Sequence, residues 1–390
     1  MINIINMNET DWIDAKSACT VLGVKAQTLY AYISRHQIKV KADPLDARQS
    51  LYSRRDIETL FKQKRRPRAR TDVAKAAIRW GDPVMPTSIS EVRGGTIWFR
   101  GHSIEDCAEE MTLEQVAALL CCAPRMICPT TLAHISGPTP FARAMKVLLL
   151  ESETSLPMLA GDAQNNAQLA GRLMSLVADA CLGQGLEGQI HERVGTAWKL
   201  GPKTQDGLRR ALVLLSDHEL NPSTFAVRGC ASTGASLPAA LISGMATLSG
   251  PKHGGVAVLA NDALNAVIDG KLETFLHENA RHDAYSYGFG HPLYPDGDPR
   301  AVHLLKQIPE RAPARLAVGQ LSERLCIAPN IDAALAAFAS HFGCPQDAAF
   351  TIFAIARVAG WIAHATEQVE SGTMIRPRAE HYSRPVQRQR

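Results

Sequence analysis

Three histidines of this sequence lie among glycines and prolines, an unusual setting for histidines that only pack on a helix face. His253 lies in GPKHGG (250–255), His291 in GFGHPL (288–293) and His218 in SDHELN (216–221). Glycine lets the backbone approach a ligand closely and leaves an imidazole uncrowded, so these loops favour a binding or catalytic role. For any one of the three taken alone, a histidine in a surface loop is the alternative.

One carboxylate and several arginines follow in the last quarter of the chain. Asp332 ends the segment PNID (329–332), and Arg300, Arg357 and Arg376 occur in DPR, AR and RPR. Guanidinium groups grip planar anions in a fixed orientation. A carboxylate that acts beside a hydrogen-bond donor can remove a proton from carbon. Together these residue types predict a site for a small polyanionic acid and a step of proton abstraction.

Motifs of other chemistries are absent from the sequence or poorly placed in it. The segment GQGLEG (183–188) matches the glycine pattern of dinucleotide-binding loops. However, it follows a helical stretch instead of a strand, which favours a loop between two helices. We find no spacing typical of zinc ligands and no GxSxG nucleophile elbow. The sequence therefore predicts neither a resident cofactor nor a metal.

Helices must position these residues, because helical periodicity dominates the chain after about residue 85. Helices separated by glycine and proline are predicted at 113–120, 142–150, 167–181, 207–216, 236–248, 261–269, 316–325, 333–342 and 348–369. The segment 88–99 alternates around Gly94 and Gly95, which predicts a small hairpin. The expected fold class of the body is mainly α, with a minor β element near its start.

The 390 residues divide by charge into a basic N-terminal region and a mildly acidic body. Residues 1–70 carry a net charge of +7 and the rest of the chain carries −3. Helices predicted at 14–22, 25–36 and 56–64, with short strands at 38–41 and 51–53, outline a winged helix-turn-helix. We expect this domain over 1–65. A basic linker is expected over 66–84, continuing the run KQKRRPRAR (62–70).

The charge of this N-terminal domain makes nucleic acid a candidate partner. The side chains expected to contact DNA are Gln27, Tyr30 and Arg35 on the second helix, with Arg54 and Arg55 beside the wing. The alternative is a helix-turn-helix that is used for contacts with a protein partner.

The sequence also predicts a cytoplasmic location. The N-terminus lacks the basic and apolar regions of a secretory signal. The uncharged stretch 229–251 is rich in Gly, Ser and Thr, which favours a packed helix over a membrane span. The nine cysteines include no CxxC pair, as expected for reduced thiols.

The order of several sequence blocks resembles the citrate synthase family over about residues 85–383. The blocks are SISEVRGGTIWFRGHSIED (88–106), DHELNPSTFAVR (217–228), ASTGAS (231–236), GPKHGG (250–255), GFGHPLYPDGDPR (288–300), APNID (328–332), ARVAG (356–360) and IRPRAEHY (375–382). The N-terminal domain is similar to a MerR-like helix-turn-helix, and some bacterial citrate synthase homologues are similar in carrying one. The resemblance implies a large helical domain over 85–253 and 346–390, with a small helical domain over 254–345.

The resemblance also implies a role for each residue at a matching position. His253 would hydrogen-bond the thioester carbonyl of acetyl-CoA, Asp332 would remove the methyl proton, and His291 would donate to the oxaloacetate carbonyl. The groups that would hold oxaloacetate are His218, Arg300, Arg357 and Arg376, the last of them supplied by the partner subunit of a homodimer. The residues expected on the CoA side are Lys252, Gly288 and Phe289.

The implied reaction is a Claisen condensation of acetyl-CoA with oxaloacetate, followed by hydrolysis to citrate and CoA. The CoA thioester is a co-substrate, and no other cofactor is expected. Two alternatives stay open: propionyl-CoA as the substrate, giving 2-methylcitrate, or a DNA-binding regulator whose body senses oxaloacetate or acyl-CoA. The chain departs from the family pattern at Tyr287, where the family usually has proline, and over 121–165, which is shorter and matches weakly.

Overall fold

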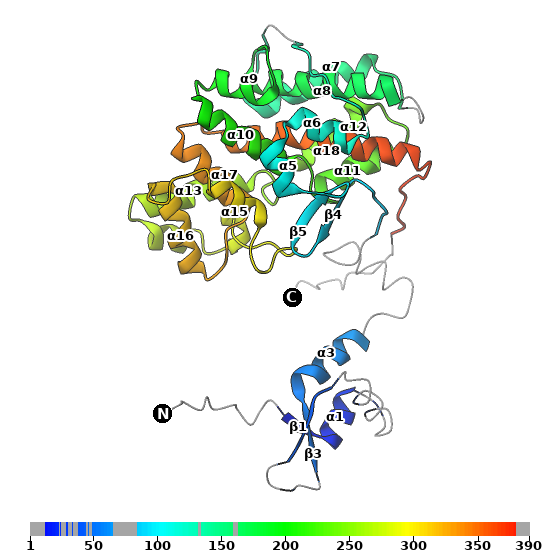
Figure 1. Cartoon of the computed structure of the whole chain (residues 1–390), viewed down its shortest axis with the longest axis vertical. Helices are drawn as coiled ribbons and strands as arrows, with labels where there is room; N and C mark the ends of the chain where they lie inside the picture. The colour runs from blue at the N-terminus through cyan, green and yellow to red at the C-terminus, as the bar shows by residue number, and fades with distance from the viewer. Residues whose placement is uncertain are drawn as a thin grey trace, which may run out of the picture. The chain divides into compact units, whose positions relative to one another are not determined.

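The computed structural model describes residues 12–22, 24, 29, 33, 38–43, 46, 49–64, 84–131, 134–158 and 163–379 (Figure 1). The chain forms two compact units, Met1–Val84 and Met85–Arg390. Each unit has its own hydrophobic core.

The N-terminal unit combines a small antiparallel sheet with helices. Its elements are β1 (Trp12–Asp14), α1 (Ala15–Leu22), β2 (Val40–Ala42), β3 (Ser50–Ser53) and α3 (Arg54–Lys64), with β3 between β1 and β2. The predicted helix 14–22 and the two predicted strands are present, and β1 is an additional short strand. The predicted helix 25–36 lies outside the described residues except at Leu29 and Ile33, of which Leu29 is buried.

The larger unit begins with the predicted hairpin. Strands β4 (Ser90–Arg93) and β5 (Thr96–Phe99) pair around Gly94 and Gly95, both at positive φ, and β6 (His102–Ser103) pairs with β5. Positive φ is readily adopted by glycine alone, which explains why two glycines form the turn.

Helices make up the rest of the larger unit. They are α5 (Ile104–Glu110), α6 (Leu113–Leu120), α7 (Pro140–Thr154), α8 (Ala163–Leu182), α9 (Ile190–Ala197), α10 (Pro202–Leu215), α11 (Pro222–Ala231), α12 (Leu237–Leu248), α13 (Val256–Ile268), α14 (Leu272–Glu278), the 3₁₀ turn η2 (Ala284–Tyr287), α15 (Pro299–Leu305), α16 (Pro313–Leu325), α17 (Ile331–His341) and α18 (Ala348–Glu370). Every helix predicted for the body is present, and residues 183–188 do form a loop between two helices. Prolines at the first helical positions of α10, α11, α15 and α16 fix where those helices start.

Helix α18 runs through the core of the larger unit, where it packs against α6, α8, α10, α11 and α12 (Figure 1). Among the described residues it is the one helix that is long and apolar enough to cross a membrane. However, 94% of its most apolar window is buried inside the unit, as is usual for a core helix. This central position brings one face of α18 beside the loops that follow α10 and α12.

Helices α13, α15, α16 and α17 gather in one lobe of the larger unit (Figure 1). They pack on one another, and α13 also packs on α14 and η2. They meet other helices of the larger unit where α17 contacts α18 and where α15 contacts α5 and α10. The start of α15 lies beside the start of α17, because Asp298 accepts a hydrogen bond from the backbone N–H of Ile331 over 3.1 Å.

Candidate active site

Two loops, two helix starts and the middle of α18 supply the candidate residues. His218 follows α10 and His291 precedes α15, and their ring centroids are 5.0 Å apart in an edge-to-face arrangement. Arg300 and Asp332 lie in the first turns of α15 and α17, and Arg357 lies in α18. The charges of Arg300 and Arg357 act on both His218 and Asp332. The structure therefore brings five of the predicted residues into one site.

His218 is buried and uncharged. Its Nε2 lies 3.0 Å from the phenol oxygen of Tyr294. Burial lowers the pKa of His218 well below its usual value, and the nearby Arg300 and His291 add to this effect. At neutral pH the ring is therefore a hydrogen-bonding group without a positive charge.

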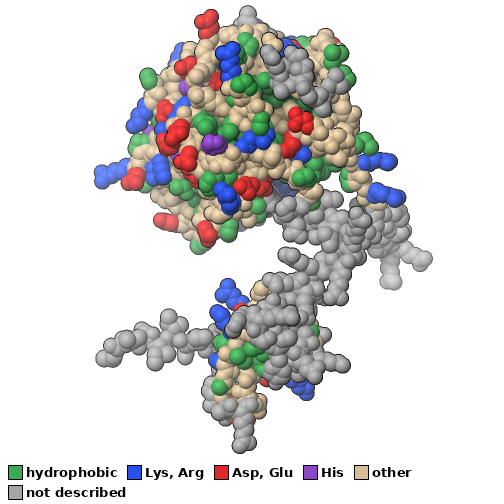
Figure 2. Space-filling model, turned by 45° about the vertical axis from the view of Figure 1, so that its right-hand side comes forward, with side chains coloured by type: hydrophobic (Ala, Val, Ile, Leu, Met, Phe, Trp, Pro, Cys, Tyr) green, Lys and Arg blue, Asp and Glu red, His purple; other side chains and the backbone are tan. Residues whose placement is uncertain are grey.

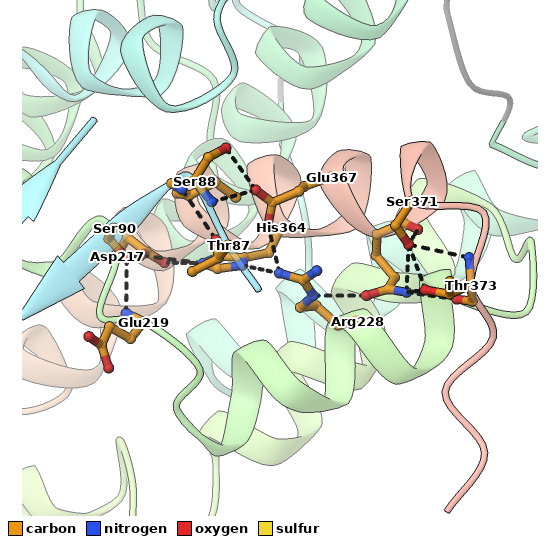
Figure 3. A network of polar contacts seen from close by, with 12 residues as sticks. Thr87, Ser88, Ser90, Asp217, Glu219, Arg228, His364, Glu367, Ser371 and Thr373 are labelled. Carbon is orange, nitrogen blue, oxygen red and sulfur yellow. Dashed lines mark hydrogen bonds and ion pairs between the residues drawn. The ribbon is translucent and has the colours of Figure 1, made fainter. Parts of the chain in front are cut away.

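The preceding residue, Asp217, anchors the loop that carries His218 (Figure 3). Asp217 is fully buried, accepts a hydrogen bond from Ser90 of β4, and has His364 Nε2 of α18 at 3.3 Å from its Oδ1. Although burial opposes ionisation, His364 and Arg357 hold the pKa of Asp217 below its usual value. The ionised carboxylate thus joins β4, the loop and α18.

The same network continues along α18 to the segment that follows it (Figure 3). Arg228 of α11 lies 3.3 Å from His364 Nδ1 and donates to Glu367 over 2.7 Å and to Gln368 over 2.9 Å. Gln368 in turn donates to the carbonyl oxygen of Thr373 over 2.8 Å. The segment after α18 is therefore fixed to the same support as the loop of His218.

Ser223, in the first turn of α11, holds one ring nitrogen of His253. The Oγ of Ser223 lies 2.8 Å from His253 Nε2. This hydroxyl is itself fixed, because it accepts from Trp361 Nε1 over 3.2 Å and donates to Asn221 Oδ1 over 2.7 Å. Within the described part of the chain, Nδ1 is the nitrogen of His253 left for a ligand.

His253 is also kept neutral by its surroundings. Its ring stands edge-on to Phe353, with 5.7 Å between centroids, and the guanidinium of Arg357 lies 4.8 Å from the same phenyl centroid. Burial, with a smaller effect from Arg357, lowers the pKa of His253 to about 3. A neutral imidazole here can donate a hydrogen bond to a carbonyl oxygen that gains negative charge.

A hydrogen bond within its own loop sets the tautomer of His291. The backbone N–H of Leu293 donates to His291 Nδ1 over 3.2 Å, so the neutral ring carries its proton on Nε2. Burial, together with the charge of Arg300, lowers the pKa of His291 to about 4. His291 therefore presents an Nε2–H donor beside His218.

The two arginines differ in how fully they are paired. Arg300 forms a fork with Asp298 through Nε at 2.9 Å and Nη2 at 2.7 Å. Arg357 donates from Nε to the carbonyl oxygen of Leu215 over 2.8 Å, whereas its buried Nη1 has no hydrogen-bond partner among the described residues. Burial lowers the pKa of Arg357 to about 10, so it is charged at neutral pH. A buried guanidinium whose Nη1 has no partner in the described part of the chain suits a ligand carboxylate.

Asp332 is a buried carboxyl group with an unusually high pKa. Its backbone N–H donates to Asn330 Oδ1 over 2.9 Å, which caps α17. Its own Oδ1 is buried without a hydrogen-bond partner in the described part of the chain. Burial raises the pKa of Asp332 to about 7, against the opposing charges of Arg300 and Arg357. Such a group is partly ionised at neutral pH, and its ionised form is basic enough to take a proton.

The remaining residues are those predicted on the CoA side, together with Arg376 and Tyr287, and none of them makes the contacts described above. Lys252 and Arg376 are exposed, the latter on the segment after α18. Gly288 has φ of 84° and ends η2, and Phe289 is buried in the core. Tyr287, the departure from the family pattern, is buried with its hydroxyl donating to the carbonyl oxygen of Asn279 over 2.8 Å. The structure therefore gives Tyr287 a packing role.

The predicted DNA-contacting residues are only partly within the described chain. Arg54 and Arg55 are exposed in the first turn of α3. Gln27, Tyr30 and Arg35 lie outside the described residues, so their expected role stays a prediction.

Sequence reasoning missed several residues that hold the site together. They are Asn221, Ser223, Tyr294 and Asp298. Each lies within one of the sequence blocks already quoted, a few residues from a predicted site residue. For Asp298 a signal was available, because an Asp directly before Pro is a frequent helix N-cap.

The described residues include no group of three or more His, Cys, Asp or Glu side chains placed to bind a metal ion. All nine cysteines are free thiols. The polar groups of the site are instead neutral imidazoles, guanidinium groups and one carboxyl, which together suit an organic polyanion.

Comparison with known proteins shows which family the chain is similar to. The family model "Citrate synthase, C-terminal domain" matches residues 162–378. The chain is 26% identical to "Citrate synthase 2" of Bacillus subtilis over 349 residues, covering 76% of this chain and 92% of the relative. It is also 26% identical to "2-methylcitrate synthase" of Shewanella oneidensis over 344 residues, covering 74% of this chain and 89% of the relative.

A solved structure shares the fold. It is the ternary complex of citrate synthase from Thermoplasma acidophilum with carboxymethyl coenzyme A and oxaloacetate, which matches with a TM-score of 0.62 at 22% identity. The match covers 79% of this chain and 96% of that one. The mainly helical fold expected from the sequence is thereby confirmed.

Proposed function

The chain belongs to the citrate synthase family, and from this premise we propose that it condenses acetyl-CoA with oxaloacetate and hydrolyses the product to citrate and CoA. The observation that carries the proposal is Asp332, a buried carboxyl with a pKa of about 7 and a partnerless Oδ1 in the described part of the chain. Binding alone would not require such a base. Proton abstraction from carbon does.

In the proposed first step, Asp332 removes a proton from the methyl group of acetyl-CoA. A thioester methyl is a very weak acid, so the electron pair must be stabilised as the proton leaves. His253 would donate from Nδ1 to the thioester oxygen, where the negative charge develops. The ring proton must then lie on Nδ1. The single hydrogen of the Ser223 hydroxyl would turn from Asn221 Oδ1 to His253 Nε2, which lies 2.8 Å from the Ser223 oxygen.

In the second step the new enol carbon attacks the keto carbon of oxaloacetate. The carbonyl electron pair moves onto the keto oxygen, which takes the proton from His291 Nε2. The carboxylates of oxaloacetate would be held by His218, Arg300, Arg357 and Arg376. The unpaired buried Nη1 of Arg357 supports this assignment, because a carboxylate would complete its hydrogen bonding.

Hydrolysis of the citryl thioester then releases CoA. We place the CoA half of the substrate near Lys252, Gly288 and Phe289. Residues 254–345, which include α13–α17, would act as a small domain that closes over the large domain of 85–253 and 346–390. Closure would exclude water during condensation.

We further propose that the enzyme is a homodimer with a shared site. Arg376 is exposed on its own chain, although the segment before it is fixed by Gln368 and by a hydrogen bond from Ile375 N–H to Ser232 Oγ of 3.1 Å. A fixed segment that presents an arginine outward suits delivery of that arginine to the oxaloacetate site of a partner subunit.

Propionyl-CoA is the second candidate substrate. It is favoured by the similarity to the relative named 2-methylcitrate synthase, which equals in identity the similarity to the relative named citrate synthase. The residues proposed above act on oxaloacetate and on the thioester oxygen, which both reactions share. The preferred acyl chain must therefore be determined from the ratio of the kcat/KM values for acetyl-CoA and propionyl-CoA.

For the N-terminal unit we propose a helix-turn-helix of MerR type that binds DNA. The unit is compact, and Lys and Arg side chains lie at its surface (Figure 2). Lys39, Lys41, Arg54 and Arg55 are exposed on its described part. The body would then either catalyse or act as the sensor of a regulator. Gel shifts with genomic fragments test DNA binding: retardation that weakens with salt supports it, and none at low salt refutes it.

The decisive experiment is to measure CoA release by the purified full-length protein. Oxaloacetate is mixed with acetyl-CoA or, separately, with propionyl-CoA, and free thiol is corrected for the nine protein cysteines. Release that needs both substrates and has the higher kcat/KM with acetyl-CoA supports citrate synthesis. A higher kcat/KM with propionyl-CoA would instead support 2-methylcitrate synthesis. If neither substrate gave CoA release, the proposed enzymatic function would be refuted.

A further inference from the structure

We propose that Asp298 is a positioning residue of the active site, which holds Arg300 and the first turn of α17 in one register so that Asp332 faces the same ligand as the arginine. The inference rests on the proposed function, because it concerns how the base of that reaction is placed. Asp298 touches neither substrate nor a reacting atom in this scheme.

The geometry of Asp298 leaves it no spare hydrogen-bonding capacity. It is 1% exposed and caps α15. Its Oδ1 accepts from the backbone N–H of Arg300 over 3.0 Å and from Arg300 Nε over 2.9 Å. Its Oδ2 accepts from Arg300 Nη2 over 2.7 Å and from the backbone N–H of Ile331 over 3.1 Å. One carboxylate therefore joins the anion-binding arginine to the residue directly before the proposed base.

Hydrogen bonds also tie the loop that carries His291 to the start of α17. Asn330 N–H donates to the carbonyl oxygen of Gly288 over 2.8 Å, and its side-chain amide donates to the carbonyl oxygen of Gly290 over 3.0 Å. Gly290 N–H donates to the carbonyl oxygen of Ala328 over 2.8 Å. The loop that carries His291 and the start of α17 thus form one hydrogen-bonded body, with Asp298 at its buried end.

The charge of Asp298 also acts on Asp332. After burial, the charged groups that face Asp332 are Arg300 and Asp298 of the α15 region and Arg357 of α18. The phenol of Tyr285 in η2 is also near, and burial keeps it neutral by raising its pKa to about 12. Asp298 raises the pKa of Asp332, whereas the two arginines lower it. Removing the charge of Asp298 should therefore make Asp332 a weaker base.

The test compares Asp298→Asn with a matched control, Asp179→Asn. Asp179 forms an equally buried pair with Arg193, 3.2 Å apart, on α8 and α9. Both variants lose the charge of one buried aspartate that pairs with an arginine. In Asp298→Asn we expect kcat to fall roughly tenfold and the acid limb of the pH profile to move down by about one unit. In Asp179→Asn the acid limb should stay in place.

An infrared titration follows Asp332 itself and needs no turnover. The C=O band of its protonated carboxyl disappears on ionisation, and Asp332→Asn identifies the band. We expect the midpoint to be lower in Asp298→Asn than in the wild type. If the wild type releases no CoA, the proposed function fails, and the infrared midpoints still decide the role of Asp298.

The results that would overturn the inference are specific. They are an infrared midpoint of Asp298→Asn equal to that of the wild type, or a kcat and acid limb that match those of Asp179→Asn. If Asp298→Asn does not fold, Asp298→Glu carries the test, since it keeps the charge and displaces the carboxylate by one methylene. A folded Asp298→Glu with lowered kcat and an unmoved acid limb supports positioning, and one with wild-type kcat refutes it.

Discussion

A buried carboxyl such as Asp332 is costly to ionise, and this cost makes it a usable base near neutral pH. Burial raises its pKa to about 7, whereas an exposed aspartate would be too weak a base to act on a thioester methyl. The neutral histidines have the same origin with the opposite direction of shift, because burial lowers their pKa values and leaves them as uncharged donors. At the scale of single residues, the site depends on charges that water cannot reach.

The first prediction concerns Asp332→Asn. We expect turnover to fall roughly 10²–10⁴-fold, as for loss of a general base, while oxaloacetate binding measured by calorimetry stays near that of the wild type. The stability of the folded protein, in contrast, should be higher in Asp332→Asn than in the wild type. The folded pKa lies above the unfolded value of 3.8, so the wild type loses stability as pH rises through the window from about 4 to about 7.

Asp332→Asn removes this loss, so its advantage in thermal unfolding should grow from pH 4 to pH 8, where it reaches roughly 1–3 kcal/mol. Calorimetric melting at several pH values measures the difference. A difference that does not depend on pH would show that Asp332 titrates normally, and turnover near that of the wild type would remove it from the mechanism.

At the scale of elements, Gly288 decides how closely the His291 loop approaches α17. Its φ is 84°, and a Cβ there would lie 2.6 Å from the backbone nitrogen of Ala333. Gly234 has a similar φ of 79° with nothing within 4 Å of such a Cβ. Gly234→Ala should therefore show only the backbone strain, roughly 1–2 kcal/mol.

Gly288→Ala adds a steric conflict with the helix that carries Asp332. We expect a larger loss of stability than in Gly234→Ala and a fall in kcat of about tenfold or more, since small displacements of a base are strongly felt. Chemical denaturation and CoA release measure the two effects. Equal stability and equal kcat in the two variants would mean that the loop and α17 can separate without consequence.

The sequence predicted the long helices well, because the apolar spacing of α8 or α18 extends over many turns. It missed α5, α9, α11, α14 and α15, which have seven to ten residues and show too few apolar repeats to be recognised. The site residues quoted from the motif blocks could be predicted from local sequence. The contacts of Ser223 with His253 and of Asp298 with Ile331 could not, because they join residues 30 and 33 positions apart in the chain.

At the scale of the whole molecule, the two units have separate cores. Residues Ala18, Leu22, Leu29, Ile38, Tyr52 and Ile57 form the core of the first unit and share none of the core cluster of the second. We therefore expect that deletion of residues 1–84 leaves a folded enzyme with kcat/KM within about twofold of the full chain. Circular dichroism and CoA release check this. An insoluble truncation would show that the N-terminal unit is part of the structural core.

The shared site of the proposed dimer gives the last prediction. Arg376→Ala alone should raise the KM for oxaloacetate, because one guanidinium grip on its carboxylates is lost. Asp332→Asn alone should be nearly inactive. If Arg376 serves the partner subunit, a mixed dimer of the two variants contains one site with an intact Asp332 and an intact Arg376, and another site that lacks both.

The mixture is assayed at an oxaloacetate concentration far below the KM of Arg376→Ala, where neither variant alone has appreciable activity. Unfolding and refolding the two variants together should then restore activity, up to about one quarter of the wild-type value for random pairing of subunits. Each variant refolded by itself is the control. If Arg376 instead acts within its own chain, every site in the mixture lacks one of the two groups and no activity returns. Because the two arrangements differ in the sign of this result, a single mixing experiment decides whether the segment fixed by Gln368 serves its own subunit or its partner.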